Sequence, residues 1–453
     1  MQQPPVAHVE WSSRLAFILA ASGSAVGLGN IWKFPYMAGE NGGGAFVLVY
    51  LLCVLAVGVP IMIAEILIGR RARLNPMDAM GTLAARHGRS GVWRWVGLAG
   101  VIAGVLIMSY YSVITGWTVA YIGKSVSGAF NGISGPQAQA VFADFISDPL
   151  DLLLWHTLVL AVVLGIAARG VAGGIERAVQ WLMPGLLVLL VALVCYGAAT
   201  GGMGAAARFL FTPDFAALDG QTVLAAMGQA FFSLSLGMGA IMMYGSYLPR
   251  QAPIGRSALI IAALDSGVAI VAGLAIFPIV FGNGMAPGEG PGLVFVTLPV
   301  GFGQLPAGGL FAGLFFLLLL FAALTSAVSL IEPGLAYLTE RTGRSRGQAV
   351  AIMGSAIWLL GIGTVLSFNV WSTPWLAGRT FFDAVDYLTS NLMLPLGGLA
   401  VALFAGWALP RLATDDELQL DTPRLRRYWR LLCRWVAPAA VVLVFLHAIG
   451  LLG

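Results

Sequence analysis

The stretch SAVGLGNIWKFPY, from Ser24 to Tyr36, interrupts the first long apolar segment of the chain with glycines, a lysine and a proline. Proline and glycine weaken or end a helix. Inside a bilayer, opened backbone is tolerated only where protein or a water-filled cavity supplies hydrogen-bond partners. The stretch therefore predicts a membrane helix that opens toward an internal cavity.

The composition is typical of a membrane protein with many spans. Only 10% of the 453 residues are charged, 59% are hydrophobic, and the mean hydropathy is +0.88. The apolar runs reach about 20 residues without alternation, which favours helices over a β-barrel. We therefore predict an all-α membrane protein with about eleven transmembrane helices. The expected spans are 13–38, 42–70, 92–123, 152–169, 176–199, 221–247, 254–281, 308–340, 347–367, 380–409 and 430–451.

Three further features of the sequence need an interpretation: a run rich in proline and glycine, a possible signal peptide, and the cysteines. The run 289–306 is rich in proline and glycine, so we expect a re-entrant or external loop there. A signal peptide ending at LAASG is disfavoured because the apolar run continues beyond it. The cysteines Cys53, Cys195 and Cys433 lie in apolar spans and indicate neither a disulfide framework nor a metal site.

The basic residues predict the orientation. If the amino terminus is cytoplasmic, all but four of the 24 Lys and Arg residues fall on the cytoplasmic side; the exceptions are Lys33, Lys124, Arg208 and Arg379. This bias follows the positive-inside rule, so the amino terminus is expected inside and the carboxyl terminus outside. The same clusters give no reason to expect nucleic-acid binding.

Two spans are interrupted by glycine in a similar way. AVGLGN (Ala25–Asn30) lies in the first span and SLSLGMG (Ser233–Gly239) in the sixth. Equivalent breaks in two halves of a chain point to a transporter binding site. Helix ends there attract anions, and freed carbonyls attract cations. The alternative is that these glycines only let helices approach closely.

The breaks divide the chain into two five-helix units of opposite orientation. We predict a first repeat at 1–199, a second, inverted repeat at 200–409, and a cytoplasmic loop with a final span at 410–453.

Several motifs in this order resemble the neurotransmitter:sodium symporter family, in its bacterial amino-acid branch with the leucine-transporter fold. They are SAVGLGNIWKFPY, ENGGGAF, GQAFFSLSLGMG and ALTSAVSLIEP, and the likeness extends over 11–386. It implies a sodium-coupled symporter, not an enzyme, in the bacterial inner membrane. The expected substrate is an amino acid taken up by alternating access.

The resemblance implies two sodium sites. The first would use Ala25, Asn30, Ser233 and Asp265 together with the substrate carboxylate. The second would use Gly23, Val26, Ala322, Thr325 and Ser326. Carbonyl and hydroxyl oxygens suit a hard cation.

The resemblance also implies a substrate pocket, with Tyr111 binding the carboxylate and Phe232 closing over the substrate. The full expected set is Ser24, Leu28, Gly29, Ile107, Tyr111, Phe232, Ser235, Met238, Ser326 and Leu330. Gly27 stands where monoamine carriers have an aspartate, so a zwitterionic amino acid is expected. Ile107, Met238 and Leu330 favour a hydrophobic or aromatic side chain.

Asp265 replaces the asparagine of many relatives, beside Tyr50, Gln229 and Ser233, which resemble chloride-site residues. A fixed carboxylate would supply the negative charge that chloride supplies in animal relatives. We therefore expect no chloride requirement. Proton uptake by Asp265 on the return step stays an open alternative.

The gates are expected to differ from those of the family. Lys33 would face Asp386 outside, with Asp383 nearby, and lysine cannot form the bidentate contact of arginine. Inside, His8 would face Glu340, supported by Trp11, Ser246 and Tyr247.

Two intramembrane acids, Glu65 and Glu332, are expected to accept hydrogen bonds from broken backbone, with proton handling as the alternative.

Three rival functions stay open. They are a sensor that binds amino acids without transport, an ion channel, and a carrier of a non-standard amino acid or osmolyte. The sequence leaves the oligomeric state open.

Overall fold

The computed structural model describes residues 10–287, 292–376, 378–418 and 422–448, and over these residues the chain is almost entirely helical. Nine helices there are long and apolar enough to cross a membrane. The predicted all-α membrane fold is confirmed. The nine are Gly44–Ala72 (α3 and α4), Gly91–Val126 (mainly α6), Pro149–Ala168 (α8), Val171–Ala199 (mainly α9), Ile254–Gly282 (α13), Gly308–Thr342 (α15), Arg346–Leu366 (α16), Phe381–Ala408 (mainly α17 and α18) and Pro423–Leu446 (mainly α20 and α21).

The first span is broken, as predicted. Helix α1 (Arg14–Ala25) begins at Ser13, whose side chain accepts a hydrogen bond from the Ala16 N–H. It ends at Val26, which has extended backbone angles. The chain re-enters a helix over Gly29–Glu40, which ends in α2 (Phe34–Glu40), and the two halves are bent by 50°.

The sixth span is broken as well. Helices α11 (Gly220–Ser233) and α12 (Ala240–Ser246) flank six residues without regular helix. Ser235, Gly237 and Gly239 have φ angles of 55°, 80° and 76°, which only glycine adopts without strain. The described residues thus contain nine spans, or ten with the bent first span, against the eleven predicted, and α11 and α12 lie at the predicted sixth span.

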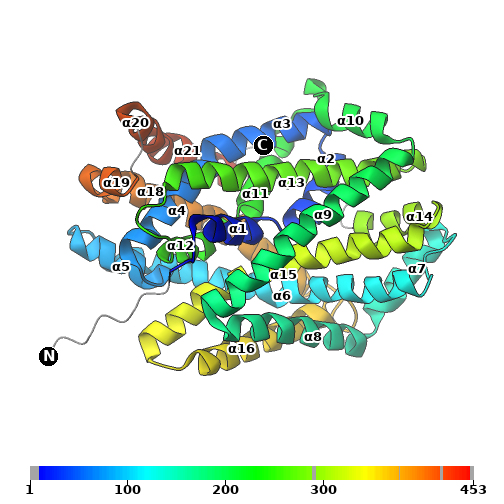
Figure 1. Ribbon diagram of the computed structural model, residues 1–453, viewed down its shortest axis with the longest axis horizontal. Helices are drawn as coiled ribbons and strands as arrows, with labels where there is room; N and C mark the ends of the chain where they lie inside the picture. The colour runs from blue at the N-terminus through cyan, green and yellow to red at the C-terminus, as the bar shows by residue number, and fades with distance from the viewer. Residues whose placement is uncertain (1–9, 288–291, 377, 419–421, 449–453) are drawn as a thin grey trace.

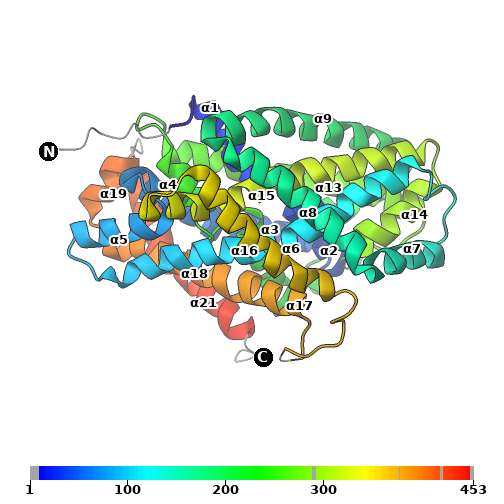
Figure 2. The same ribbon diagram turned by 90° about the horizontal axis from the view of Figure 1, so that it is seen from below.

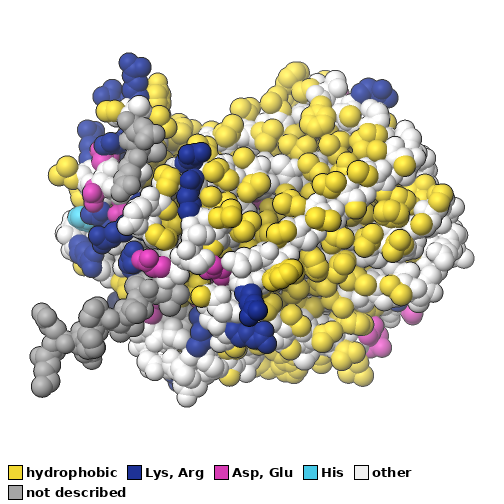
Figure 3. All heavy atoms as spheres, in the orientation of Figure 1, with side chains coloured by type: hydrophobic (Ala, Val, Ile, Leu, Met, Phe, Trp, Pro, Cys, Tyr) yellow, Lys and Arg dark blue, Asp and Glu magenta, His cyan; other side chains and the backbone are white. Residues whose placement is uncertain are grey.

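The shorter helices lie at the ends of the bundle. Figures 1 and 2 both place α5 (Pro76–Arg86) and α19 (Arg411–Leu418) at one end, and α7 (Gly135–Ser147) and α14 (Leu298–Gly303) at the other. Helix α10 (Met203–Phe211) follows α9. Figure 3 shows hydrophobic side chains over the flank and most Lys and Arg side chains at the end that carries α5 and α19. The charge-poor flank fits a hydrocarbon environment.

The run 289–306 differs in part from its prediction. It does not span, but it is helical over Leu293–Gly303, and 288–291 lie outside the described residues. Pro299 is the second residue of α14, which continues directly from a π-helical turn at Leu293–Thr297. The division into repeats at 199 and 409 stays a prediction.

Glycines allow the helices around the breaks to approach closely. A Cβ at Gly69 on α4 would lie 1.8 Å from the Met242 carbonyl oxygen of α12. A Cβ at Gly104 on α6 would lie 2.7 Å from the Leu330 carbonyl oxygen of α15. Helix α12 is therefore held against α4, and α6 against α15, with almost no clearance.

We predict that Gly69→Ala lowers the melting temperature of the purified protein in detergent. The added methyl group must displace α12, and such overpacking costs about 1–3 kcal/mol. Gly228→Ala on α11 is the matched control, because nothing lies within 4 Å of that position. Equal melting temperatures for the two variants would contradict the close contact between α4 and α12.

Candidate functional site

The break in the first span faces the middle of α15 through one hydroxyl group. Ser326 Oγ lies 3.2 Å from the Gly23 carbonyl oxygen, 3.0 Å from that of Ser24 and 3.3 Å from that of Val26. Three carbonyls that a continuous helix would use internally thus converge on a single serine. This geometry gathers oxygens around one point.

Thr325 completes the same group. Its Oγ1 donates to the Ala322 carbonyl oxygen at 2.9 Å. Its Cβ would lie 3.2 Å from a Cβ placed on Gly23. The five residues predicted for the second sodium site therefore lie together, and they offer only uncharged oxygen atoms. Such a donor set fits a hard monovalent cation.

The first predicted sodium group centres on Asp265 of α13, whose side chain is fully buried. The Asn30 amide nitrogen donates to Asp265 Oδ1 at 2.7 Å and to Ser233 Oγ at 3.1 Å. The Asn30 amide oxygen accepts from the Gly27 N–H at 3.0 Å. Ala25 is the last residue of α1, next to this group in the chain. The two breaks thus meet at Asp265.

Neutral donors alone surround this carboxylate among the described residues. Ser233 Oγ donates to Asp265 Oδ2 at 2.6 Å, and the Tyr50 hydroxyl lies 3.3 Å from the same oxygen. Gln229 Nε2 donates to the Gly29 carbonyl oxygen at 2.7 Å. Tyr50, Ser233 and Asp265 therefore form one cluster, and Gln229 ties the first break to α11.

The main chain at the first break approaches Tyr111 of α6. The Leu28 N–H donates to the Tyr111 hydroxyl oxygen at 3.2 Å. A Cβ at Gly27 would lie 2.8 Å from that oxygen and 2.4 Å from Ser326 Oγ. The site has no room for any side chain at Gly27, which agrees with the absence of an aspartate there.

The second break also contacts the first. Ser235 Oγ donates to the Ser24 carbonyl oxygen at 2.9 Å, and the Ser24 hydroxyl donates to Ser329 Oγ at 2.7 Å. A Cβ at Gly29 would lie 2.9 Å from the Phe232 ring. Polar residues expected in the substrate pocket therefore do lie together.

The apolar part of that pocket is less defined. Ile107, Met238 and Leu330 are all buried, on α6, the second break and α15 respectively. No described contact joins the three side chains, so their common role stays a prediction.

A cavity of about 450 Å³ lies at the residues that were predicted to form the outer gate. Lys33, Phe232, Asp383 and Asp386 are among its lining residues. Lys33 Nζ lies 4.5 Å from the centroid of the Phe232 ring, a cation–π contact. Within the described part of the chain, no ion pair within 4.0 Å joins Lys33 to an acid.

The two predicted outer acids have local partners. Asp386 Oδ1 accepts from Ser390 Oγ at 2.8 Å, and Asp383 Oδ2 accepts from Thr380 Oγ1 at 2.7 Å. Asp383 thereby belongs to the cap of α17. The pairing of Lys33 with Asp386 stays a prediction for a closed outer side.

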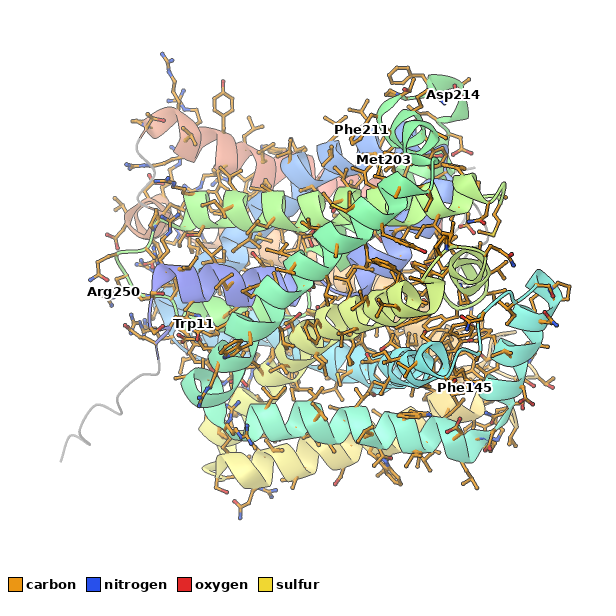
Figure 4. All side chains as sticks on the ribbon, turned by 45° about the vertical axis from the view of Figure 1, so that its right-hand side comes forward. Trp11, Phe145, Met203, Phe211, Asp214 and Arg250 are labelled. Atoms are coloured by element: carbon orange, nitrogen blue, oxygen red, sulfur yellow. The ribbon has the colours of Figure 1, made fainter. Side chains whose placement is uncertain are left out.

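The opposite end is closed by Trp11, which packs edge-on against Tyr244 and Tyr247. Its Nε1 donates to the Tyr244 carbonyl oxygen at 3.0 Å, and its backbone N–H donates to the Tyr247 carbonyl oxygen at 3.0 Å. Figure 4 places Trp11 and Arg250 at this end of the molecule, with Phe145 and Asp214 at the other. Trp11 and Tyr247 therefore do lie together, as expected of an inner gate.

Glu332 was expected to accept from broken backbone, and this was wrong. It accepts from the Tyr247 hydroxyl at 2.9 Å and from both terminal nitrogens of Arg346, at 3.0 and 2.6 Å. Arg346 also donates to the Ala167 carbonyl oxygen at 2.7 Å. A fully buried acid needs such a partner, and this requirement could have pointed to Arg346 in the sequence.

Two other residues predicted for the inner gate have partners in the described part of the chain, and the pairing of Glu340 with His8 stays a prediction. Glu340 Oε2 accepts from the N–H and side-chain nitrogen of Asn75, at 2.9 and 2.7 Å. Ser246 Oγ donates to the Met243 carbonyl oxygen of its own helix. His8, the predicted partner of Glu340, lies outside the described residues.

Two further acids hold the ends of the broken helices. Glu65 Oε1 accepts from the Gly237 N–H at 2.8 Å, which confirms its predicted role at broken backbone. Glu176 was not predicted from the sequence; it accepts hydrogen bonds from Ser12 and from Gln180. Glu176 thus fixes the chain just before α1.

Comparisons with known proteins agree with this geometry. The sequence model of the sodium:neurotransmitter symporter family matches residues 8–132 and 145–451. YhdH of Bacillus subtilis, an uncharacterised sodium-dependent transporter, is 40% identical over 447 residues and 98% of each chain. A taurine transporter of Canis lupus familiaris is 26% identical, over 85% of this chain and 69% of its own length. The crystal structure of MhsT in complex with L-phenylalanine superposes with a TM-score of 0.90 at 45% identity, covering 97% of this chain and 99% of MhsT.

We predict that Arg346→Met lowers the free energy of unfolding by about 3 kcal/mol, because it leaves the buried Glu332 without its cation. The double variant Glu332→Gln/Arg346→Met is expected to recover much of this loss. Chemical denaturation in detergent measures both.

The matched control for this cycle is Arg344→Met, which changes an exposed arginine two residues away. It should alter stability by less than about 0.5 kcal/mol. Glu332→Gln alone completes the cycle. If the losses of stability in Arg346→Met and Glu332→Gln simply summed to the loss in the double variant, the two side chains would not be coupled and the interpretation would be wrong.

Proposed function

Since the chain belongs to the sodium:neurotransmitter symporter family, we propose that it is a sodium-coupled symporter that takes up hydrophobic amino acids by alternating access. One observation carries the proposal: the two broken spans contact each other, through Asn30 with Ser233 and Ser235 with Ser24. Their freed carbonyls gather around Ser326, and a buried carboxylate lies at Asp265. Broken helices of this kind bind substrate and coupling ion together.

Two sodium ions fit the donor groups. The carbonyl and hydroxyl set around Ser326 has no charged side chain, which suits one Na⁺. The Asp265 carboxylate lacks a cationic side chain among its described partners. A buried carboxylate is costly unless its charge is balanced, so a second Na⁺ near Asn30 and Ser233 would lower that cost.

A zwitterionic amino acid fits the space beside the first break. Gly27 leaves no room for an acid that could pair with the amine of a substrate lacking a carboxylate. The substrate carboxylate would approach Tyr111 and the first sodium ion. The L-phenylalanine bound to MhsT supports a hydrophobic or aromatic side chain near Ile107, Met238 and Leu330.

Transport would proceed by alternate opening of the two ends. Substrate enters through the outer cavity, where Phe232 and Lys33 lie between solvent and the breaks. The outer side then closes, and release of Trp11 and of the Glu332–Arg346 pair opens the inner side. The sodium gradient and membrane potential supply the energy, the latter about 2.3 kcal/mol per charge per 100 mV.

The proposed location is the bacterial inner membrane, with the amino terminus cytoplasmic and the carboxyl terminus outside. The excess of arginine at the end that carries α5 and α19 supports this orientation. The relatives in bacteria support the compartment.

We predict sodium-driven accumulation of L-phenylalanine in proteoliposomes, with competition from leucine, tryptophan and tyrosine. Replacing external sodium by potassium should abolish accumulation, because no ion gradient would then be coupled. Radiolabel uptake measures this, and empty liposomes are the control. Binding without accumulation would identify a sensor. Competition by taurine but by none of the hydrophobic amino acids would identify an osmolyte carrier.

We also predict that replacing chloride by gluconate leaves wild-type uptake unchanged, because the Asp265 carboxylate supplies a fixed negative charge. Asp265→Asn removes that charge and should lower uptake at least about tenfold without chloride. Added chloride should restore part of the activity of this variant. Loss of wild-type uptake in gluconate would contradict the role given to Asp265.

A further inference from the structure

A second polar cavity lies far from the broken helices, where the chain passes from the tenth span to the last. Its volume is about 380 Å³, and its lining includes five arginines and one aspartate, Asp415. The arginines are Arg411 of α19, Arg426, Arg427 and Arg430 of α20, and Arg434 in the following turn. Figure 3 shows Lys and Arg side chains gathered around α19 and α20.

Four of these five arginines have no ion-pair partner among the described residues. Across the described residues, no ion pair within 4.0 Å includes Arg411, Arg427, Arg430 or Arg434. Among the described residues of the lining, Asp415 is the single acid. Like charges held this close repel each other, so the cavity favours an anion.

Arg430 is an incompletely satisfied member of this lining. Its side chain is buried, with 7% relative exposure of the residue, and one terminal nitrogen donates to Thr414 Oγ1 at 2.8 Å. Its Nε is buried and has no hydrogen-bond partner among the described residues. An unsatisfied buried donor is costly, and an acceptor bound in the cavity would relieve that cost.

Arg434 and two tryptophans mark the depth of the cavity. Arg434 Nε donates to the Gly406 carbonyl oxygen at 2.6 Å, and its guanidinium lies 4.7 Å from the Trp407 ring centroid. Trp407 contacts Trp435 edge-on, and both rings are exposed. Exposed tryptophans beside arginine are typical of the headgroup level of a membrane.

We propose that this cavity binds the phosphodiester headgroup of an anionic phospholipid such as phosphatidylglycerol. Guanidinium groups bind phosphate oxygens in bidentate fashion, and basic pockets beside membrane helices select anionic headgroups. Exposed Leu431 and Trp435 line the same cavity and would contact the start of the acyl chains. The lipid would join α19 to the last span, a role independent of sodium and amino-acid binding.

The test compares nanodiscs of phosphatidylcholine alone with nanodiscs that also contain phosphatidylglycerol. Native mass spectrometry counts retained lipid, and thermal unfolding measures stabilisation. For the wild type, phosphatidylglycerol should be retained in preference to phosphatidylcholine and should raise the melting temperature. Arg427→Gln/Arg434→Gln should weaken retention at least about tenfold.

Arg424→Gln is the matched control, because Arg424 is an exposed arginine of the same helix that does not line the cavity. Arg427→Gln alone changes an exposed position, so it tests the site even if the double variant fails to fold. It should lose less of the retained phosphatidylglycerol than the double variant. If Arg424→Gln lost as much retained phosphatidylglycerol as the double variant, the attraction would be nonspecific and the proposed site would be wrong. An equal rise in melting temperature with inorganic phosphate would show a free-anion site instead of a lipid site. Sodium-driven uptake that persists in the variants leaves the transport proposal intact.

Discussion

The structure depends on one constraint: backbone N–H and C=O groups inside a bilayer need partners within the protein. Two helices can therefore open only where other residues replace the lost helical hydrogen bonds. Tyr111 receives the Leu28 N–H, Glu65 receives the Gly237 N–H, and Ser326 approaches three freed carbonyls. These replacements come from α4, α6 and α15, the helices that have no such break. The continuous helices thus specify where the broken ones can open.

Two buried acids, Glu332 and Asp265, differ in role because their partners differ. Glu332 is held by both terminal nitrogens of Arg346, so its charge is balanced by the protein itself. Among the described residues, Asp265 receives only neutral donors, from Asn30, Ser233 and Tyr50. A charge that the protein does not balance remains available to an ion that comes and goes. The position of the arginine, more than the depth of either acid, separates the two roles.

The sequence was sufficient for features that depend on neighbouring residues. Glycine spacing located both breaks, and apolar runs located the spans, because a membrane helix forms all its hydrogen bonds within one segment. Partners across the bundle were harder. The pairing of Glu340 with Asn75, and of Lys33 with the Phe232 ring, depends on how separate helices pack, which local pattern does not encode. The helix at Leu293–Gly303 was missed because the prolines and glycines of the run 289–306 together indicated a loop.

The closeness of Gly27 to Ser326 and Tyr111 also limits how this protein can diverge in evolution. Any side chain at Gly27 collides with two groups at once, one from α15 and one from α6. A substitution at Gly27 would therefore require a compensating change at Ser326 or Tyr111. Gradual adaptation to other substrates is easier through the walls that α6 and α15 provide, where one residue can change without a simultaneous change elsewhere. A change of substrate range through residues of these walls therefore needs fewer simultaneous substitutions than a change at Gly27.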